Sequence, residues 1–162
     1  MLRETKNPPD RRVPLTPDQC RRLLDTYPEL DIRIQPSEGR CYSDDEYIAR
    51  KLTLAEDLGD CQILMGVKSE NPALLPDKTY LFFLTQPRNN PGQPLLQEVV
   101  RKRIRMIDYE YLTDENGVRV VAFGRWAGVV GAYNGLRAWG LRKKTLSGGG
   151  FVLPPANECR GF

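Results

Sequence analysis

The chain has 162 residues, enough for one α/β domain with a substantial core but too few for two full domains. Its 24 basic and 21 acidic residues leave a net charge of +3, which is too balanced to predict a nucleic-acid partner. No run approaches the ~18 consecutive apolar residues of a membrane span and no signal peptide opens the chain, so we expect a cytoplasmic protein without a membrane partner.

The sequence contains no histidine, the side chain that most often moves protons near neutral pH. Any catalysis would therefore use lysine, carboxylate, tyrosine or cysteine side chains, or a cofactor. The four cysteines form no C-x-x-C pair, so we expect no metal site and interpret them as buried free thiols. They are Cys20, Cys41, Cys61 and Cys159.

Helices and strands are expected to alternate along the first half of the chain. A strand of a few residues can open it, and a helix follows Thr16, which can cap that helix with Pro17 at its first position. Residues 31–35 alternate apolar and polar side chains, as in a short strand, and residues 43–46 fit a capping box that opens a second helix. Two apolar runs then predict strands covered on both faces, at residues 61–67 and 79–84.

The second half predicts a helix, two strands and a long C-terminal helix. The shorter helix is expected at residues 95–102, and the strands at 104–107 and 118–123, with a turn between them at 114–117. Residues 124–141 predict the long helix. This alternation is typical of an α/β fold with an open, mainly parallel sheet flanked by helices. We expect the domain to span residues 1–145 and residues 146–162 to form a flexible exit segment.

Four glycines of the long helix, at positions 124, 128, 131 and 135, recur every three or four residues and share one face. Such a face lets another backbone approach closely, although each glycine lowers helix propensity by up to ~1 kcal/mol. The partner backbone can belong to this domain or to a second domain that docks on Gly124, Gly128, Gly131 and Gly135. Their spacing does not match G-x-G-x-x-G, so we expect no dinucleotide bound by this chain alone.

Charged residues follow several of the predicted strands, at the edge where ligands of open α/β sheets bind. Arg12 can clamp a substrate carboxylate, Lys68 can be a partly desolvated amine suited to proton transfer, and Glu110 can pair with Lys68 or with a substrate ammonium. Arg3 lies near the same edge. The alternative for each is an ordinary surface charge. Together they predict a site for a small zwitterion of amino-acid size.

Several sequence blocks resemble the alanine dehydrogenase/pyridine nucleotide transhydrogenase N-terminal domain family. The opening blocks are Arg3-Glu4-Thr5-Lys6 and residues 10–17. Further blocks follow in family order, at residues 66–68, 78–83, 107–110 and 118–128. The resemblance covers almost the whole chain, and the most similar version is that of saccharopine dehydrogenase (lysine-forming) and of the lysine-ketoglutarate reductase half of aminoadipic semialdehyde synthase.

The resemblance implies a flavodoxin-like or Rossmann-like substrate domain of an NAD-linked oxidoreductase of amino-acid and lysine metabolism. The family's catalytic lysine falls on Lys68, its substrate-binding arginine on Arg12 and its acidic residue on Glu110. Arg3 and Arg119 are further substrate-binding candidates. The substrate would be a small amino acid or 2-oxo acid. NAD would bind a separate domain that docks on the glycine helix, since no part of this chain resembles the NAD-binding domain.

Three departures from the family keep other interpretations open. The family's histidine falls on Leu84 or Thr85, neither of which can replace imidazole in proton transfer. The NAD-binding half is missing from the sequence, and the chain starts almost inside its first strand. The chain can therefore be the substrate half of a split enzyme, a non-catalytic amino-acid-binding or regulatory domain, or a truncated remnant.

Overall fold

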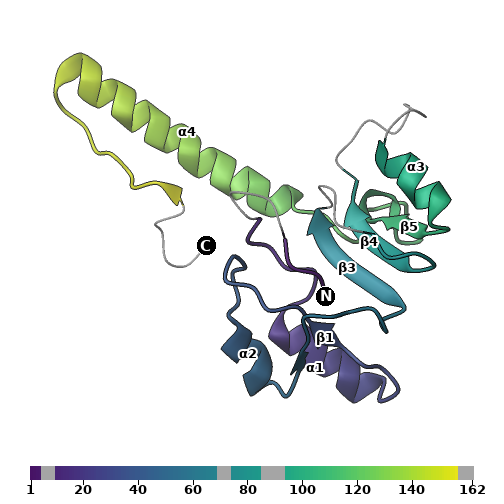
Figure 1. Ribbon diagram of the computed structural model, residues 1–162. Helices are drawn as coiled ribbons and strands as arrows, with labels where there is room; N and C mark the ends of the chain where they lie inside the picture. Colours follow the sequence, from purple (N-terminus) through teal and green to yellow (C-terminus); the bar gives the residue numbers. More distant parts are fainter. Residues whose placement is uncertain (5–9, 69–73, 85–93, 157–162) are drawn as a thin grey trace. The chain divides into compact units, whose positions relative to one another are not determined.

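The computed structural model describes residues 1–4, 10–68, 74–84 and 94–156 (Figure 1). The chain divides into two compact units, Met1–Val120 and Val121–Phe162. Within the described residues, all strands belong to the first unit, and the second unit is built around one long helix. The predicted α/β fold with parallel strands flanked by helices is confirmed, and so is the long C-terminal helix.

The first half of the Met1–Val120 unit pairs two short helices with a two-stranded parallel sheet. Helix α1 (Pro17–Thr26) begins at the predicted cap Thr16, where Gln19 completes a capping box that the sequence analysis did not single out, and helix α2 (Asp44–Ala49) begins with the predicted capping box. Strand β1 (Arg33–Ile34) pairs with strand β2 (Thr53–Leu54), which the sequence did not predict. Five buried side chains from these elements and their flanks form one core cluster, namely Met1, Cys20, Ile34, Tyr47 and Leu52.

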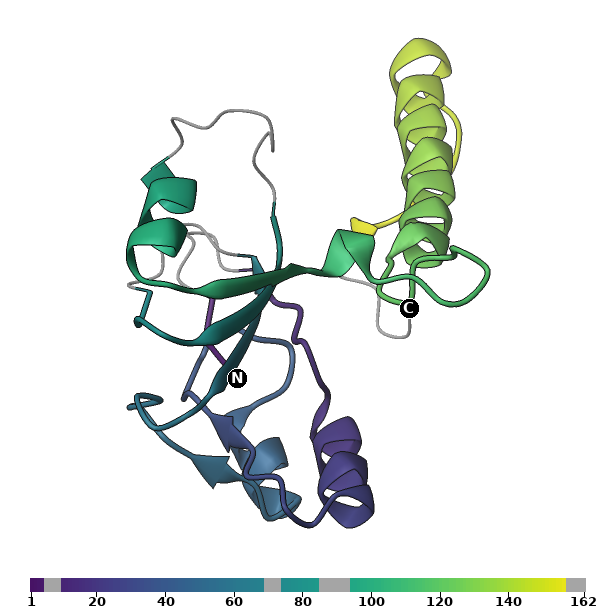
Figure 2. The same cartoon turned by 90° about the vertical axis from the view of Figure 1, so that its right-hand side faces the viewer.

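The second half of this unit is a three-stranded parallel sheet in the order β3-β4-β5. Strand β3 (Ile63–Lys68), strand β4 (Thr79–Phe83) and strand β5 (Arg105–Asp108) follow closely the predicted runs. Helix α3 (Pro94–Arg101) lies beside the sheet (Figure 2) and contributes Leu95 and Val99 to a second core cluster. The side chains of β4 alternate between buried and half-buried, so one face is fully covered and the other partly covered, whereas β3 begins with the exposed Ile63.

The first two residues join the two sheets. The N–H of Leu2 donates to the carbonyl of Met65 (2.8 Å) in β3, and the N–H of Gln35, next to β1, donates to the carbonyl of Met1 (3.0 Å). Residues 1–2 therefore occupy the place of the expected N-terminal strand between β1 and β3, although they are too few to form a regular strand.

The predicted strand at residues 118–123 is wrong. Its flanking turn is present, because Asp114 Oδ1 accepts the N–H groups of Asn116 and Val118, both at 2.9 Å, and Gly117 takes a φ of 77°. Beyond the turn, an isolated antiparallel bridge joins Thr113 to Arg119, and the N–H of Val120 donates to the carbonyl of Leu112 (3.0 Å), but the described residues form no regular strand here. Val118 stays 62% exposed, so the apolar run has neither a neighbouring strand nor a core to pack on within the described residues.

The Val121–Phe162 unit consists of helix α4 (Gly124–Ser147) and a segment that returns along it. The helix is six residues longer than predicted and ends at Gly148, which takes the left-handed conformation common at helix ends. Tyr133 donates its hydroxyl to the carbonyl of Pro154 (3.0 Å), and a Cβ at Gly140 would lie 2.3 Å from the carbonyl oxygen of Phe151. The expected exit segment thus begins inside α4, and its residues Phe151 and Pro154 contact the helix again.

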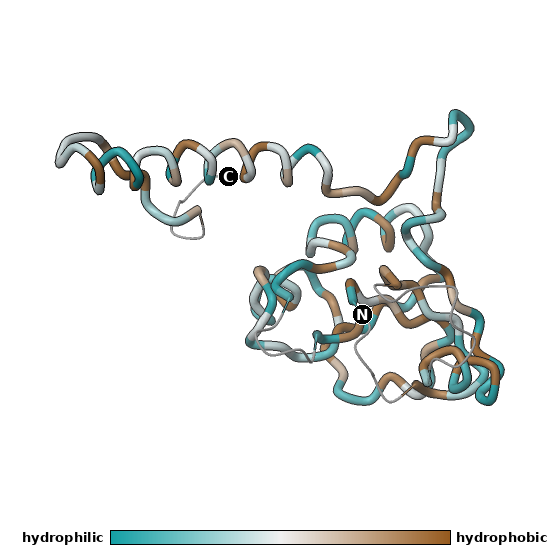
Figure 3. The backbone as a smooth tube through the Cα atoms, turned by 90° about the horizontal axis from the view of Figure 1, so that it is seen from above, coloured by the Kyte–Doolittle hydropathy of each residue, from teal (hydrophilic) through white to brown (hydrophobic). Residues whose placement is uncertain are grey.

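The four glycines that share one face of α4 are open. A Cβ added at Gly124, Gly128, Gly131 or Gly135 would meet nothing within 4 Å, so the returning segment of the same unit does not cover these glycines. Hydrophobic residues recur along α4 between hydrophilic ones (Figure 3), and several are exposed, including Trp126, Leu136 and Trp139. No helix among the described residues combines the length and apolarity needed to cross a bilayer.

The cysteines are not uniformly buried. Cys20 lies in the core as expected, Cys61 is half-buried, and Cys41 is exposed in a turn among charged side chains, so the interpretation of buried thiols is wrong for Cys41. Cys159 lies outside the described residues.

Candidate functional site

The carboxyl ends of β3, β4 and β5 meet at one edge of the sheet, because the three strands are parallel. Lys68 ends β3 opposite Phe83 of β4, and Asp108 ends β5 opposite Phe82. A short 3-10 turn, η1 (Tyr109–Tyr111), follows β5 and carries Glu110. The predicted residues Lys68 and Glu110 therefore lie at the same edge of the sheet.

Arg12 and Lys68 are brought together by a carboxylate that sequence reasoning did not single out. Arg12 holds Asp10 with two side-chain hydrogen bonds, from Nε to Oδ1 (2.9 Å) and from Nη2 to Oδ2 (2.5 Å). The Nζ of Lys68 lies 3.7 Å from Asp10 Oδ2. The Asp10 side chain is 13% exposed and thus largely shielded from water, whereas the side chains of Arg12 and Lys68 are about one third exposed.

A second carboxylate, Glu4, lies against the end of β3. Its Oε1 accepts the N–H groups of Val67 (2.8 Å) and Lys68 (3.3 Å). The register between β3 and β4 shifts by one residue between Met65 and Lys68, so the regular ladder is interrupted at this point. Gly66 permits the arrangement, since a Cβ there would lie 2.7 Å from the Phe82 ring.

The contact between Asp10 and Arg12 stabilises both groups in their charged forms. The hydrogen bond from Arg12 lowers the pKa of Asp10 to about 2, and the same bond raises the pKa of Arg12. Burial raises the pKa of Glu4, while hydrogen bonds from the backbone of Val67 and Lys68 oppose that shift. Asp10 is thus an anion held by two cations. Substrate carboxylates are commonly bound by arginine and lysine in this way.

Glu110 and Arg119 form a separate pair at the same edge. Glu110 Oε2 lies 3.5 Å from Arg119 Nη1, and both side chains are about half exposed. Asp108 positions Glu110 by accepting its backbone N–H (3.0 Å). The structure therefore places two further predicted residues in mutual contact just beyond β5.

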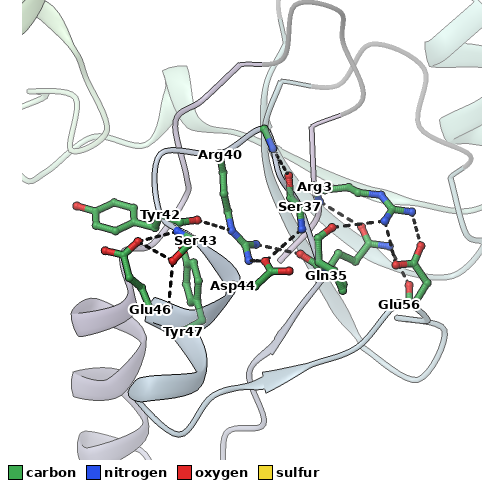
Figure 4. A network of polar contacts seen from close by, with 12 residues as sticks. Arg3, Gln35, Ser37, Arg40, Tyr42, Ser43, Asp44, Glu46, Tyr47 and Glu56 are labelled. Carbon is green, nitrogen blue, oxygen red and sulfur yellow. Dashed lines mark hydrogen bonds and ion pairs between the residues drawn. The ribbon is translucent and has the colours of Figure 1, made fainter. Parts of the chain in front are cut away.

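Arg3 lies in a different set of contacts. Its guanidinium donates to Glu56 Oε2 (2.9 Å) and to the carbonyl of Pro36 (3.4 Å), beside the β1–β2 sheet (Figure 4). Of the two positions for the family's histidine, Leu84 donates its backbone N–H to Asp108 Oδ1 (3.4 Å), and Thr85 lies outside the described residues.

A polar hollow of about 390 Å³ lies beside α2, around Arg40. The Arg40 side chain is only 7% exposed and forms an ion pair with Asp44. It also donates to the carbonyls of Tyr42 (2.8 Å) and Gln35 (2.9 Å) (Figure 4), and its guanidinium lies 4.4 Å from the centre of the Tyr47 ring. Because these contacts are internal, Arg40 acts as a structural clamp that holds the turn before α2.

Comparisons with known proteins agree with this architecture. A family model described as alanine dehydrogenase/PNT, N-terminal domain, matches residues 1–130. The mitochondrial alpha-aminoadipic semialdehyde synthase of Bos taurus is 41% identical over 148 residues, which make up 90% of this chain and 16% of that protein. The NAD(+), L-lysine-forming saccharopine dehydrogenase of Yarrowia lipolytica is 28% identical over 149 residues, which make up 88% of this chain and 40% of that protein.

The fold is also that of a solved L-alanine dehydrogenase, with a TM-score of 0.62 at 20% identity over 91% of this chain and 41% of that one. The chain spans less than half the length of each of these relatives. Since the family model covers most of the residues, the chain belongs to the alanine dehydrogenase/PNT N-terminal domain family.

Proposed function

We propose that the Met1–Val120 unit binds a small amino acid or 2-oxo acid, and that the chain is the substrate-binding part of an NAD-linked amino-acid oxidoreductase of the saccharopine or alanine dehydrogenase kind. One observation carries this proposal. Arg12 and Lys68, which lie far apart in the sequence, both contact the Asp10 carboxylate at the carboxyl end of β3.

The chemistry of the cluster supports a carboxylate ligand. A substrate carboxylate has the same charge and shape as the Asp10 carboxylate that Arg12 holds with two hydrogen bonds, and in this proposal it takes the place of Asp10 on the guanidinium. The amine of Lys68, at the edge of the sheet, is then placed beside the reacting carbon and can exchange a proton with the substrate. Arg12 binds and orients the substrate in this proposal, and Lys68 is the catalytic residue.

The roles proposed for Glu110, Arg119 and Arg3 are supported by other contacts. Glu110 and Arg119, paired at the same sheet edge, are proposed as a catalytic acid or base and a further carboxylate ligand. A substrate role for Arg3 requires its guanidinium to exchange Glu56 for the ligand.

NAD supplies or accepts the hydride when it is bound, and we propose that a separate NAD-binding domain brings it to this chain. The open glycines Gly124, Gly128, Gly131 and Gly135 of α4 support a docking surface for that domain, because each leaves room for another backbone.

Calorimetric titration of the chain with saccharopine, L-lysine, L-alanine and 2-oxoglutarate tests the proposal. We expect at least one ligand to bind, and Arg12→Gln to weaken its binding by about tenfold or more, because charge-assisted bonds contribute roughly 1.5–3 kcal/mol.

Arg103→Gln is the matched control. Arg103 holds Asp77 through two bonds of 2.7 and 2.8 Å, at the opposite edge of the sheet where β4 and β5 begin. This variant should leave binding unchanged. No binding of any ligand, or an equal loss in both variants, would contradict the proposed site.

A second candidate function is a non-catalytic amino-acid-binding domain. It is favoured by Leu84, which occupies one of the two positions at which the family carries its histidine, in a sequence without any histidine. Adding the NAD-binding domain of a relative and following NADH formation separates the two functions, since binding without turnover supports the second.

The cellular compartment is a further part of the proposal. The sequence predicts the cytoplasm, whereas the relative from Bos taurus is named as mitochondrial. Fluorescence microscopy of a tagged chain in its native cells distinguishes these locations.

A further inference from the structure

Among the described residues, three tyrosines are buried, and their hydroxyl groups differ. Tyr47 donates its hydroxyl to the carbonyl of Leu15 (2.9 Å), and the Tyr80 hydroxyl accepts the N–H of Leu75 (2.7 Å). Tyr109 is only 5% exposed, yet its hydroxyl has no hydrogen-bond partner among the described residues. Because burying an unbonded hydroxyl opposes folding, this group requires an explanation that the other two do not.

The position of Tyr109 connects it to the proposed site. It is the first residue of η1, at the sheet edge where β3 ends with Lys68. Its ring lies 5.1 Å from the ring of Phe83, the residue that pairs with Lys68 in the β3–β4 ladder. The Glu4 carboxylate, which accepts the N–H of Lys68, lies close enough to act electrostatically on Tyr109.

We propose that the Tyr109 hydroxyl is a substrate-binding group that donates a hydrogen bond to an oxygen of the carboxylate or 2-oxo group held by Arg12 and Lys68. This inference rests on the proposed function and adds a residue to its site. Burial, followed by the nearby charge of Glu4, raises the pKa of Tyr109, so the phenol keeps its proton and is a donor near neutral pH.

The arrangement also favours oxygen-bearing ligands over apolar ones. A buried donor that is satisfied only by the ligand disfavours any ligand that lacks the matching acceptor, because the donor then stays unpaired. Tyr109 thereby contributes to specificity as well as to affinity.

Tyr109→Phe removes one oxygen and retains the ring that packs on Phe83. We expect its melting temperature to equal or exceed that of the unchanged chain, because no described bond is lost. For the ligand that the unchanged chain binds best among saccharopine, L-lysine, L-alanine and 2-oxoglutarate, we expect Kd to rise roughly three- to tenfold, the range of one net hydrogen bond.

Tyr80→Phe is the matched control with the opposite expectation. It leaves the N–H of Leu75 without its acceptor, so its melting temperature should fall while the Kd of the folded chain stays the same.

The outcomes separate the inference from the proposed function. If the unchanged chain binds a ligand and Tyr109→Phe binds it equally well, the inference is wrong and the proposed function stands. A fall in melting temperature for Tyr109→Phe as large as that for Tyr80→Phe would show a structural role for the hydroxyl, which also overturns the inference. If the unchanged chain binds none of the four ligands, the proposed function itself fails.

Discussion

Asp10 lies between the two cations of the proposed site, and its contribution to stability depends on pH. Its pKa of about 2 in the folded chain is below the ordinary value of ~3.9, so the stabilisation is complete above about pH 5 and is lost as the pH falls toward 2. We expect Asp10→Asn to lower the free energy of unfolding near neutral pH by about 1–2 kcal/mol, a value reduced for the partial exposure of Arg12. Urea denaturation across this pH range measures the effect.

Asp77→Asn provides the control for this prediction. Asp77 is held by Arg103 in a similar pair, but both side chains are more than half exposed, so water screens the interaction and the loss should be smaller. An Asp10→Asn variant whose stability changes with pH as steeply as that of the unchanged chain would contradict the assigned role of Asp10.

The residues of the site were only partly predictable from the sequence. Lys68 and Glu110 could be placed at one edge because each follows a recognisable strand. Asp10, Glu4 and Tyr109 stood in the sequence blocks that resemble the family, but their roles depend on contacts between segments far apart in the chain. The one local signal was the spacing of Asp10 and Arg12, since residues two apart in an extended segment point to the same side.

Gly66, within the irregular stretch at the end of strand β3, allows close contact with strand β4. A Cβ at this position would lie 2.7 Å from the Phe82 ring and 3.6 Å from Glu4, and Phe82 is fixed in the core beside Tyr80. We expect Gly66→Ala to lower the free energy of unfolding by about 1–3 kcal/mol, the usual cost of an overpacked core. Urea denaturation followed by circular dichroism measures this change.

Gly128→Ala is the control at the level of helix α4. A Cβ at Gly128 meets nothing within 4 Å, and alanine is the better helix former. The free energy of unfolding of this variant should therefore rise by up to ~1 kcal/mol. If Gly66→Ala were as stable as the unchanged chain, the close contact between β3 and β4 would not constrain residue 66.

Local signals predicted those elements whose ends are marked by particular residues. The Thr16 cap followed by Pro17 predicted the start of α1, the capping box at Ser43 predicted the start of α2, and apolar runs predicted β3 and β4. Strand β2 has two residues, too few for any periodicity. Residues 118–123 have a strand-like composition, but a strand also needs a neighbouring strand to pair with. Whether such a neighbour is present cannot be told from the composition of the segment itself.

At the scale of the Met1–Val120 unit, the two parallel sheets are connected through the first two residues. Leu2→Pro removes the N–H that binds the carbonyl of Met65, and it should be about 1–3 kcal/mol less stable than Leu2→Ala, which keeps this hydrogen bond. Comparing the two variants by urea denaturation separates the backbone contribution from the packing of the side chain. Equal stabilities would mean that the connection does not depend on this bond.

The alternation of strands and helices was sufficient to predict an open parallel α/β fold, and the likeness to L-alanine dehydrogenase agrees with it. The division of the strands into two sheets was not predictable, because it depends on residues 1–2 lying between β1 and β3. The order of strands in space is a long-range property that composition and periodicity do not encode.

Helix α4 shows what its glycines permit. At Gly140, the carbonyl oxygen of Phe151 lies 2.3 Å from the place that a Cβ would take. The returning chain can follow this path only because glycine has no Cβ. Gly124, Gly128, Gly131 and Gly135 offer the same kind of notch without a backbone in it. A protein that docks on this helix would therefore make carbonyl-to-helix contacts of the kind that the chain already makes with itself at Gly140.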